Sequence, residues 1–99
     1  MSKPVCLLWL DDVEFYKTAL ARVGLADHFE LHHVNRDGQP PADIIPRVEV
    51  LVGWKHGGHL AQMPKLCWVQ AMTAGVEAWL DAPGLREDVI LCCARGSHR

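Results

Sequence analysis

Hydrophobic residues in this chain gather in five short runs, which are separated by polar segments rich in glycine and proline. Most runs are almost continuously apolar, which is typical of strands covered on both faces of a parallel sheet. The run FELHHV differs because Glu30, His32 and His33 interrupt it, and we expect this strand nearer an edge. The predicted strands cover residues 4–10, 29–34, 48–53, 66–71 and 89–93.

Helical spacing of apolar residues follows the first and the fourth run. In DDVEFYKTALARVG the apolar residues recur with a helical period, and Gly24 stands where a C-terminal cap belongs. In TAGVEAWLDAPG we expect Val76, Trp79 and Leu80 to form the apolar face of a second helix. The piece HLAQM is predicted to be a short helical segment that ends before Pro64.

The alternation of strands and helical segments over short connections indicates an α/β fold, a doubly wound parallel sheet with right-handed crossovers. Five strands fit the flavodoxin-like order 2-1-3-4-5. The tail ARGSHR is polar and offers no helix to cover the last strand, so we expect the fold to lack its final helix. The 99 residues are enough for one core, and we interpret residues 1–99 as a single, incomplete domain.

The charges narrow the possible partners. Ten basic and 12 acidic residues are mixed along the chain and give a net charge of -2, which leaves no positive stripe for nucleic acid or anionic lipid. No apolar run approaches the roughly 18 residues that a bilayer span needs. The N-terminus becomes acidic where a secretory signal has its cleavage site. We therefore expect a cytoplasmic chain that binds neither nucleic acid nor membranes.

All four cysteines lie in apolar runs, where cysteine usually behaves as a small buried hydrophobe. Zinc is the alternative, because His56 and His59 are three positions apart. However, no Cys-x-x-Cys pair is present, and the two glycines of KHGGHL suit a loop better than a helix that carries ligands. We therefore expect no metal, and core packing for Cys6, Cys67, Cys92 and Cys93.

Two aspartates, Asp11 and Asp12, close the first run, and LLWLDDVEFYKTALARVGL resembles the opening of a receiver domain. In a receiver such acids hold magnesium for a phosphorylated aspartate after the third strand. This chain has no aspartate between Asp43 and Asp81, and it lacks the lysine expected after the fifth strand. One of the two aspartates is better explained as the N-cap of the following helix. A receiver-like protein-interaction module without a phosphoacceptor is the alternative function.

The block PKLCWVQ...AGVE, the dipeptide Gly53-Trp54 and the segment LCCARG form a more specific pattern. It resembles the N-terminal part of the substrate-binding domain of the D-isomer-specific 2-hydroxyacid dehydrogenases, in the glyoxylate/hydroxypyruvate reductase branch. The resemblance implies that main-chain N–H groups of Ala74, Gly75 and Val76 hold the carboxylate of a small 2-keto or 2-hydroxy acid, and that Trp54 lines the pocket. Core packing is the alternative for Trp54, and a simple turn glycine is the alternative for Gly75.

We assign the other three tryptophans, Trp9, Trp68 and Trp79, to packing.

Full-length members of this family continue into an NAD(P)-binding domain with a G-x-G-x-x-G turn, and they use an arginine, a glutamate and a histidine for catalysis. The segment GWKHGG lacks that glycine spacing, and no residue here matches the catalytic set. The resemblance therefore implies a fragment of an NAD(P)-dependent oxidoreductase that binds no cofactor by itself and does not catalyse alone. We also expect uncovered apolar sheet surface to promote self-association.

Overall fold

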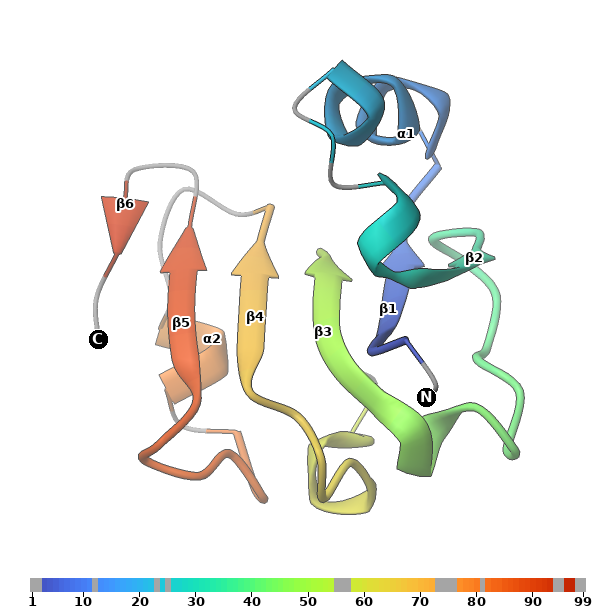
Figure 1. The fold of residues 1–99 in the computed structure, drawn as a ribbon. Helices are drawn as coiled ribbons and strands as arrows, with labels where there is room; N and C mark the ends of the chain where they lie inside the picture. The colour runs from blue at the N-terminus through green and yellow to red at the C-terminus, as the bar shows by residue number, and fades with distance from the viewer. Residues whose placement is uncertain are drawn as a thin grey trace.

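The computed structural model describes residues 3–11, 13–22, 24, 26–54, 58–72, 77–80, 82–93 and 96–97 of the chain. Its sheet has the strand order β2-β1-β3-β4-β5-β6, and β1 to β5 pair in parallel (Figure 1). The predicted parallel α/β sheet of order 2-1-3-4-5 is thereby confirmed. The strands are β1 (Val5–Trp9), β2 (Glu30–Val34), β3 (Val48–Gly53), β4 (Trp68–Ala71), β5 (Ile90–Cys93) and β6 (Gly96–Ser97).

The sixth strand is a departure from the sequence-based prediction, which gives the tail no regular structure. Gly96 and Ser97 run antiparallel to β5, where they face Cys93 and Cys92. A strand of two residues is too short to show an alternation of apolar and polar positions. Strand β6 forms because it pairs with β5, and a local sequence pattern does not show which strands will pair.

The helical elements are short. They are α1 (Val13–Arg22), η1 (Ala26–His28), η2 (Ile45–Arg47), η3 (Leu60–Gln62) and α2 (Glu77–Leu80), where η denotes a 3-10 helix. Along α1, the exposed positions recur at helical spacing, as predicted, and Gly24 follows with a φ of 76°. The helical piece expected in HLAQM is η3. Among the described residues, no helix is long and apolar enough to cross a membrane.

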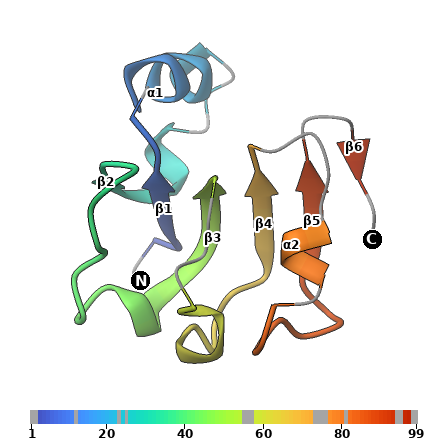
Figure 2. The ribbon, with the colours of Figure 1, turned by 180° about the vertical axis from the view of Figure 1, so that it is seen from behind.

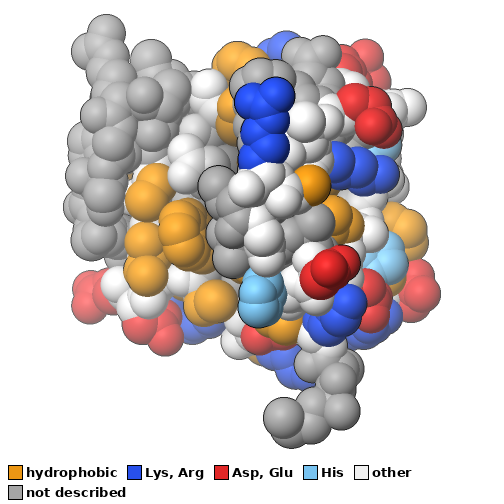
Figure 3. Space-filling model, turned by 45° about the horizontal axis from the view of Figure 1, so that its top comes forward, with side chains coloured by type: hydrophobic (Ala, Val, Ile, Leu, Met, Phe, Trp, Pro, Cys, Tyr) orange, Lys and Arg blue, Asp and Glu red, His pale blue; other side chains and the backbone are white. Residues whose placement is uncertain are grey.

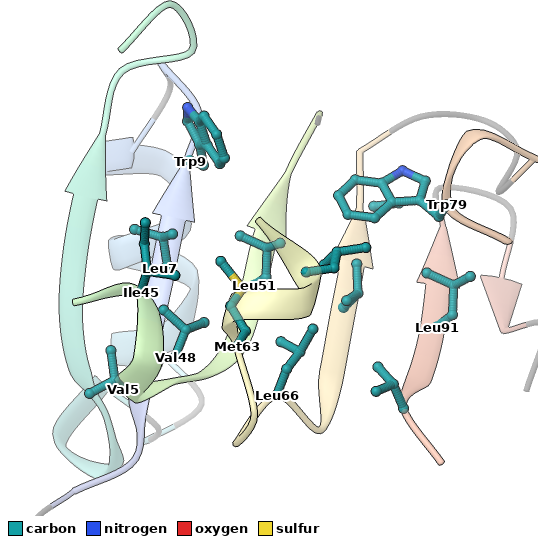
Figure 4. Close-up of a cluster of buried hydrophobic side chains, with 14 of the residues drawn as sticks. Val5, Leu7, Trp9, Ile45, Val48, Leu51, Met63, Leu66, Trp79 and Leu91 are labelled. Atoms are coloured by element: carbon teal, nitrogen blue, oxygen red, sulfur yellow. The ribbon is translucent and has the colours of Figure 1, made fainter. Parts of the chain in front are cut away.

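One face of the sheet, called face A here, carries the row Leu7, Leu51, Val69 and Leu91 across β1, β3, β4 and β5. All four side chains are fully buried. From η3 and α2, Leu60 and Trp79 pack into the same cluster, and Figure 2 shows α2 in front of the strands on this side. Figure 4 shows the labelled members Leu7, Leu51, Leu91 and Trp79 on this side of the strands. Face A therefore holds the main core.

The opposite face, face B, carries the row Cys6, Val50, Trp68 and Ile90. Cys6 is buried at the β1 end, but Trp68 and Ile90 are 43% and 46% exposed. Figure 1 shows α1 and η1 near β1, and no described helix in front of β3, β4 and β5. In Figure 3, hydrophobic side chains gather on the side of the molecule where β4 and β5 lie.

Several packing predictions are corrected by this asymmetry. Trp9 and Trp79 are buried as expected, but Trp68 is not, because it points to the uncovered part of face B. Leu80 is 44% exposed and does not belong to the buried face of α2. Alternation along a strand or helix shows which residues share a face, but it does not show which face another element covers.

The cysteines also differ from one another. Cys6 is buried, Cys92 is half-buried on face B, and the side chain of Cys93 lies outside the described residues. Cys67 is exposed, so its predicted core packing is wrong. It precedes β4, and its thiol donates a hydrogen bond to the carbonyl oxygen of Glu49 at 3.3 Å. Burial raises the pKa of the Cys6 thiol to about 12.

Strand β2 is the first in the strand order, as the interrupted run FELHHV predicts. The carboxylate of Glu30 accepts two hydrogen bonds from Nη2 of Arg47, at 2.8 and 3.0 Å. It also contacts Nε2 of His32 at 2.5 Å. The hydrogen bond from His32 and the nearby charge of Arg47 lower the pKa of Glu30. This charged group lies at the outer strand of the sheet and is called the β2 edge cluster below.

Candidate functional site

Because β1 to β5 are parallel, their carboxyl ends lie at one edge of the sheet, the edge toward which the arrowheads of β3, β4 and β5 point in Figure 1. Strands β1 and β3 are neighbours there, although the chain visits β2 between them. In open α/β sheets the place where the strand order reverses is where ligands bind, just beyond the carboxyl ends of the strands. The ends of β1, β2 and β3 are therefore the first place to look for a site.

Gly53 ends β3 and is paired with Trp9 of β1. A Cβ atom at position 53 would lie 2.6 Å from the carbonyl oxygen of Trp9, so only glycine allows the two backbones to approach this closely. The carbonyl of Gly53 also accepts the N–H of Met72, which follows β4, at 2.9 Å. These contacts hold the end of β3 firmly between its two neighbours, and Trp54 is the residue that follows.

Trp54 is 40% exposed at this edge. The guanidinium carbon of Arg36 lies 4.7 Å from the centroid of its ring, within the range of a cation–π contact. The exposure excludes the core alternative for Trp54. Its role in lining a pocket stays a prediction.

Arg36 follows β2 and is held by its main chain. Its N–H donates to Oδ1 of Asp11 at 2.9 Å, and Gly38 closes a turn by donating to the carbonyl of Asn35. Nearby, Nε2 of His33 donates to the carbonyl of Leu10 at 2.7 Å. The ends of β1 and β2 are thus joined twice, and the turn after β2 is directed toward β3.

This contact gives Asp11 a role that the sequence analysis does not predict. The carboxylate joins two strand ends by accepting the N–H of Arg36, a residue 25 positions away. The predicted N-cap of α1 by one of the two aspartates stays a prediction. Asp12, the other candidate cap, lies outside the described residues.

His59 lies against Trp9, with a distance of 6.0 Å between the ring centroids. Its Nδ1 lies 3.0 Å from Oε1 of Gln62, and its Nε2 lies 3.3 Å from Oε1 of Gln39. Both ring nitrogens thus have neutral side-chain partners. His56 falls outside the described residues, and within the described part of the chain no three His, Cys, Asp or Glu side chains are grouped as a metal site.

The other predicted site residues, Ala74, Gly75 and Val76, lie outside the described residues. Strand β4, which is the neighbour of β3, ends at Ala71, and Met72 is the last described residue before them. The predicted main-chain anion site therefore remains a prediction.

Sequence reasoning missed Arg36. The sequence analysis gives no role to Arg36, although it stands two residues after the predicted strand 29–34, where a basic side chain can meet an anion at the carboxyl end of a sheet. The contact with Trp54 could not be predicted, because 18 positions separate the two residues and only the strand order brings them together. With a cation, an aromatic face and nearby strand ends, this edge is suited to binding a small anion.

No protein-family model matches the chain, and no curated protein matches it significantly in sequence. A solved structure does match: a D-isomer specific 2-hydroxyacid dehydrogenase family protein from Aeromonas salmonicida subsp. salmonicida, with a TM-score of 0.75 and 30% sequence identity. The match covers 96% of this chain and 30% of that protein. The resemblance found in the sequence is therefore confirmed: nearly all of this chain corresponds to one part of a D-isomer specific 2-hydroxyacid dehydrogenase family protein.

Proposed function

We propose that this chain supplies one wall of the substrate site of an NAD(P)-dependent 2-hydroxyacid dehydrogenase of the glyoxylate/hydroxypyruvate reductase type. In this proposal, the main-chain N–H groups of Ala74, Gly75 and Val76 bind the carboxylate of a small 2-keto or 2-hydroxy acid. Trp54 covers the apolar part of the acid. Hydride transfer needs a nicotinamide held close to the substrate carbon. In this proposal a second domain holds that nicotinamide. The chain alone binds the acid without reducing it.

The observation that carries the proposal is the agreement between the structural match and the place of Trp54. The match is with a D-isomer specific 2-hydroxyacid dehydrogenase family protein. Trp54 is exposed beyond the end of β3, beside the strand order reversal where such folds bind ligands. An exposed tryptophan just beyond a strand end that is held tightly between its neighbours supports a ligand-lining role for Trp54.

The binding wall can be tested by NMR on the ¹⁵N-labelled chain titrated with glyoxylate and with hydroxypyruvate. We expect the amide signals of residues 74–76 and the indole N–H of Trp54 to shift together along one binding curve. Trp54→Ala should weaken binding roughly tenfold, about 1.4 kcal/mol, because it removes one apolar side of the site.

Trp68→Ala is the matched control, because Trp68 is about equally exposed but lies on face B. It should leave the titration unchanged. If saturating acid shifts no amide signal in residues 74–76, or if both tryptophan variants lose binding equally, the proposed wall is wrong.

A further inference from the structure

We propose that the connection from α2 to β5 is a strap that holds the η3 segment against face A, and that Arg86 fastens it. The strap is residues 82–89 and the η3 segment is residues 59–66, all of which the structure describes. The two segments lie side by side near the lower ends of the strands in Figures 1 and 2. They open together, as one unit, while the sheet stays folded.

The two segments cross at very close range. A Cβ atom at Gly84 would lie 2.4 Å from the main-chain nitrogen of Ala61 and 2.7 Å from its Cβ. The φ of Gly84 is 87°, in the left-handed region that favours glycine. The main chain of the strap therefore passes directly over η3, with no room for a side chain between them.

Arg86 adds polar links at this crossing. Its Nη1 donates to the carbonyl of Met63 at 3.2 Å, and its Nη2 donates to the carbonyl of Leu66. Its Nε donates to Oδ1 of Asp88, within the strap, at 3.3 Å. Carbonyls at the end of a helical turn lack helical partners, and an arginine side chain can supply them. One guanidinium thus joins the strap to two main-chain carbonyls of the η3 segment.

Both segments are built from local turns. In the η3 segment, the N–H groups of Gln62, Met63 and Leu66 each bond the carbonyl three positions earlier. In the strap, the N–H groups of Leu85 and Val89 do the same. These five N–H groups are called the turn amides below. Their hydrogen bonds stabilise each turn but do not tie it to the sheet, and segments held in this way are the ones that open locally in native proteins.

Apolar packing couples the two segments. Leu60, Met63 and Leu66 are buried in the core cluster of face A, and Ala82 and Leu85 of the strap pack against the same cluster. Figure 4 shows Met63 and Leu66 on this side of the strands. Lifting either segment alone would leave the apolar side chains of the other partly uncovered, which costs free energy. We therefore expect one cooperative opening of both segments.

Independent fraying of the two segments is the alternative explanation, and each segment would then have its own opening free energy. Native-state hydrogen exchange of the ¹⁵N-labelled chain in low concentrations of urea separates the two explanations. We expect the turn amides of both segments to share one opening free energy. The amides of β1 should exchange more slowly by roughly tenfold or more, because the sheet opens only in global unfolding.

Arg86→Gln should raise the opening equilibrium of the turn amides in both segments by the same factor, roughly tenfold or about 1.4 kcal/mol, because it removes the links to two carbonyls. Arg86→Lys should have a smaller effect, since lysine keeps the charge but loses the fork that reaches both carbonyls. Arg47→Gln is the matched control, because the side chain of Arg47 is similarly exposed, 44% against 39%, and bonds Glu30 in the β2 edge cluster. It should leave the exchange of the turn amides unchanged.

Two results would overturn the strap. One is a native chain in which the turn amides of the two segments open with different free energies, or open only together with the amides of β1. The other is an Arg86→Gln variant in which the turn amides of the strap exchange faster while those of the η3 segment do not. The comparison within the native chain needs no variant, so a misfolded Arg86→Gln would not prevent the test.

Discussion

Single residues in this chain differ in accessibility in ways that their sequence surroundings hide. Cys6 and Cys67 both lie in apolar runs, yet Cys6 is buried under face B and Cys67 is exposed before β4 begins. A thiol reacts as the thiolate, and only when a reagent can reach it. Burial both shields the Cys6 thiol and raises its pKa to about 12.

This difference can be measured by alkylating the native chain with iodoacetamide at pH 8 and locating the modified peptides by mass spectrometry. We expect Cys67 to be modified rapidly and Cys6 to be modified only after denaturant is added. A Cys67→Ser variant should remove the rapid phase, while Cys6→Ser should not affect it. Rapid modification of native Cys6 would contradict its burial.

At the residue scale the sequence identified Trp54 but not its partner. The position of Trp54 just past a strand end follows from the apolar run before it, whereas its role came from the family resemblance and its exposure was not predicted. Arg36 and Asp11 could not be placed, because their contact joins segments 25 positions apart. Local patterns place residues within elements, and contacts between the ends of elements need the topology.

Among the elements, the strands were the most predictable. The third strand has the predicted bounds, Val48–Gly53, and the others are shorter than predicted by one or two residues at some ends. Parallel strands buried on both faces must be apolar throughout, so the signal is strong. Strand β6 and the exposure of Leu80 were missed because both depend on neighbouring elements.

The β2 edge cluster makes the stability of this strand depend on pH. Because the folded state lowers the pKa of Glu30 below its ordinary value of 4.5, Glu30 stabilises the fold above that value. The contribution is lost as the pH falls through the lower pKa of the folded state, since the protonated carboxyl no longer pairs with Arg47 and His32.

Urea unfolding from pH 3 to pH 7 should therefore show a loss of stability below about pH 4.5 that is smaller in Glu30→Gln. Glu14→Gln, an exposed acid on α1 that forms no ion pair among the described residues, is the control and should keep the native pH profile. If the native chain and Glu30→Gln lose the same unfolding free energy between pH 7 and pH 3, the β2 edge cluster does not stabilise the fold.

At the scale of the whole molecule, the uneven cover of the sheet is the dominant feature. Face A is packed against η3 and α2, whereas Trp68 and Ile90 leave apolar surface open on face B. The chain corresponds to 30% of the length of the dehydrogenase family protein that it matches. Apolar patches of this kind on soluble proteins usually meet another surface.

We predict that the 99-residue chain self-associates through face B. Sedimentation velocity should show dimers or larger species, and combining Trp68→Gln with Ile90→Lys should shift the chain toward the monomer. Leu80→Gln, which alters an exposed apolar side chain of α2 on the face A side, should leave the association unchanged. A native chain that sediments as a monomer at all concentrations tested would refute this prediction.

The β2 edge cluster also determines how such copies can meet. A bare outer strand offers its unpaired peptide groups to any other strand, and sheets can then grow without limit from one molecule to the next. Glu30, Arg47 and His32 place charged and polar side chains along the outer strand instead. Assembly of this chain should consequently stop at small, discrete particles and not proceed to fibrils.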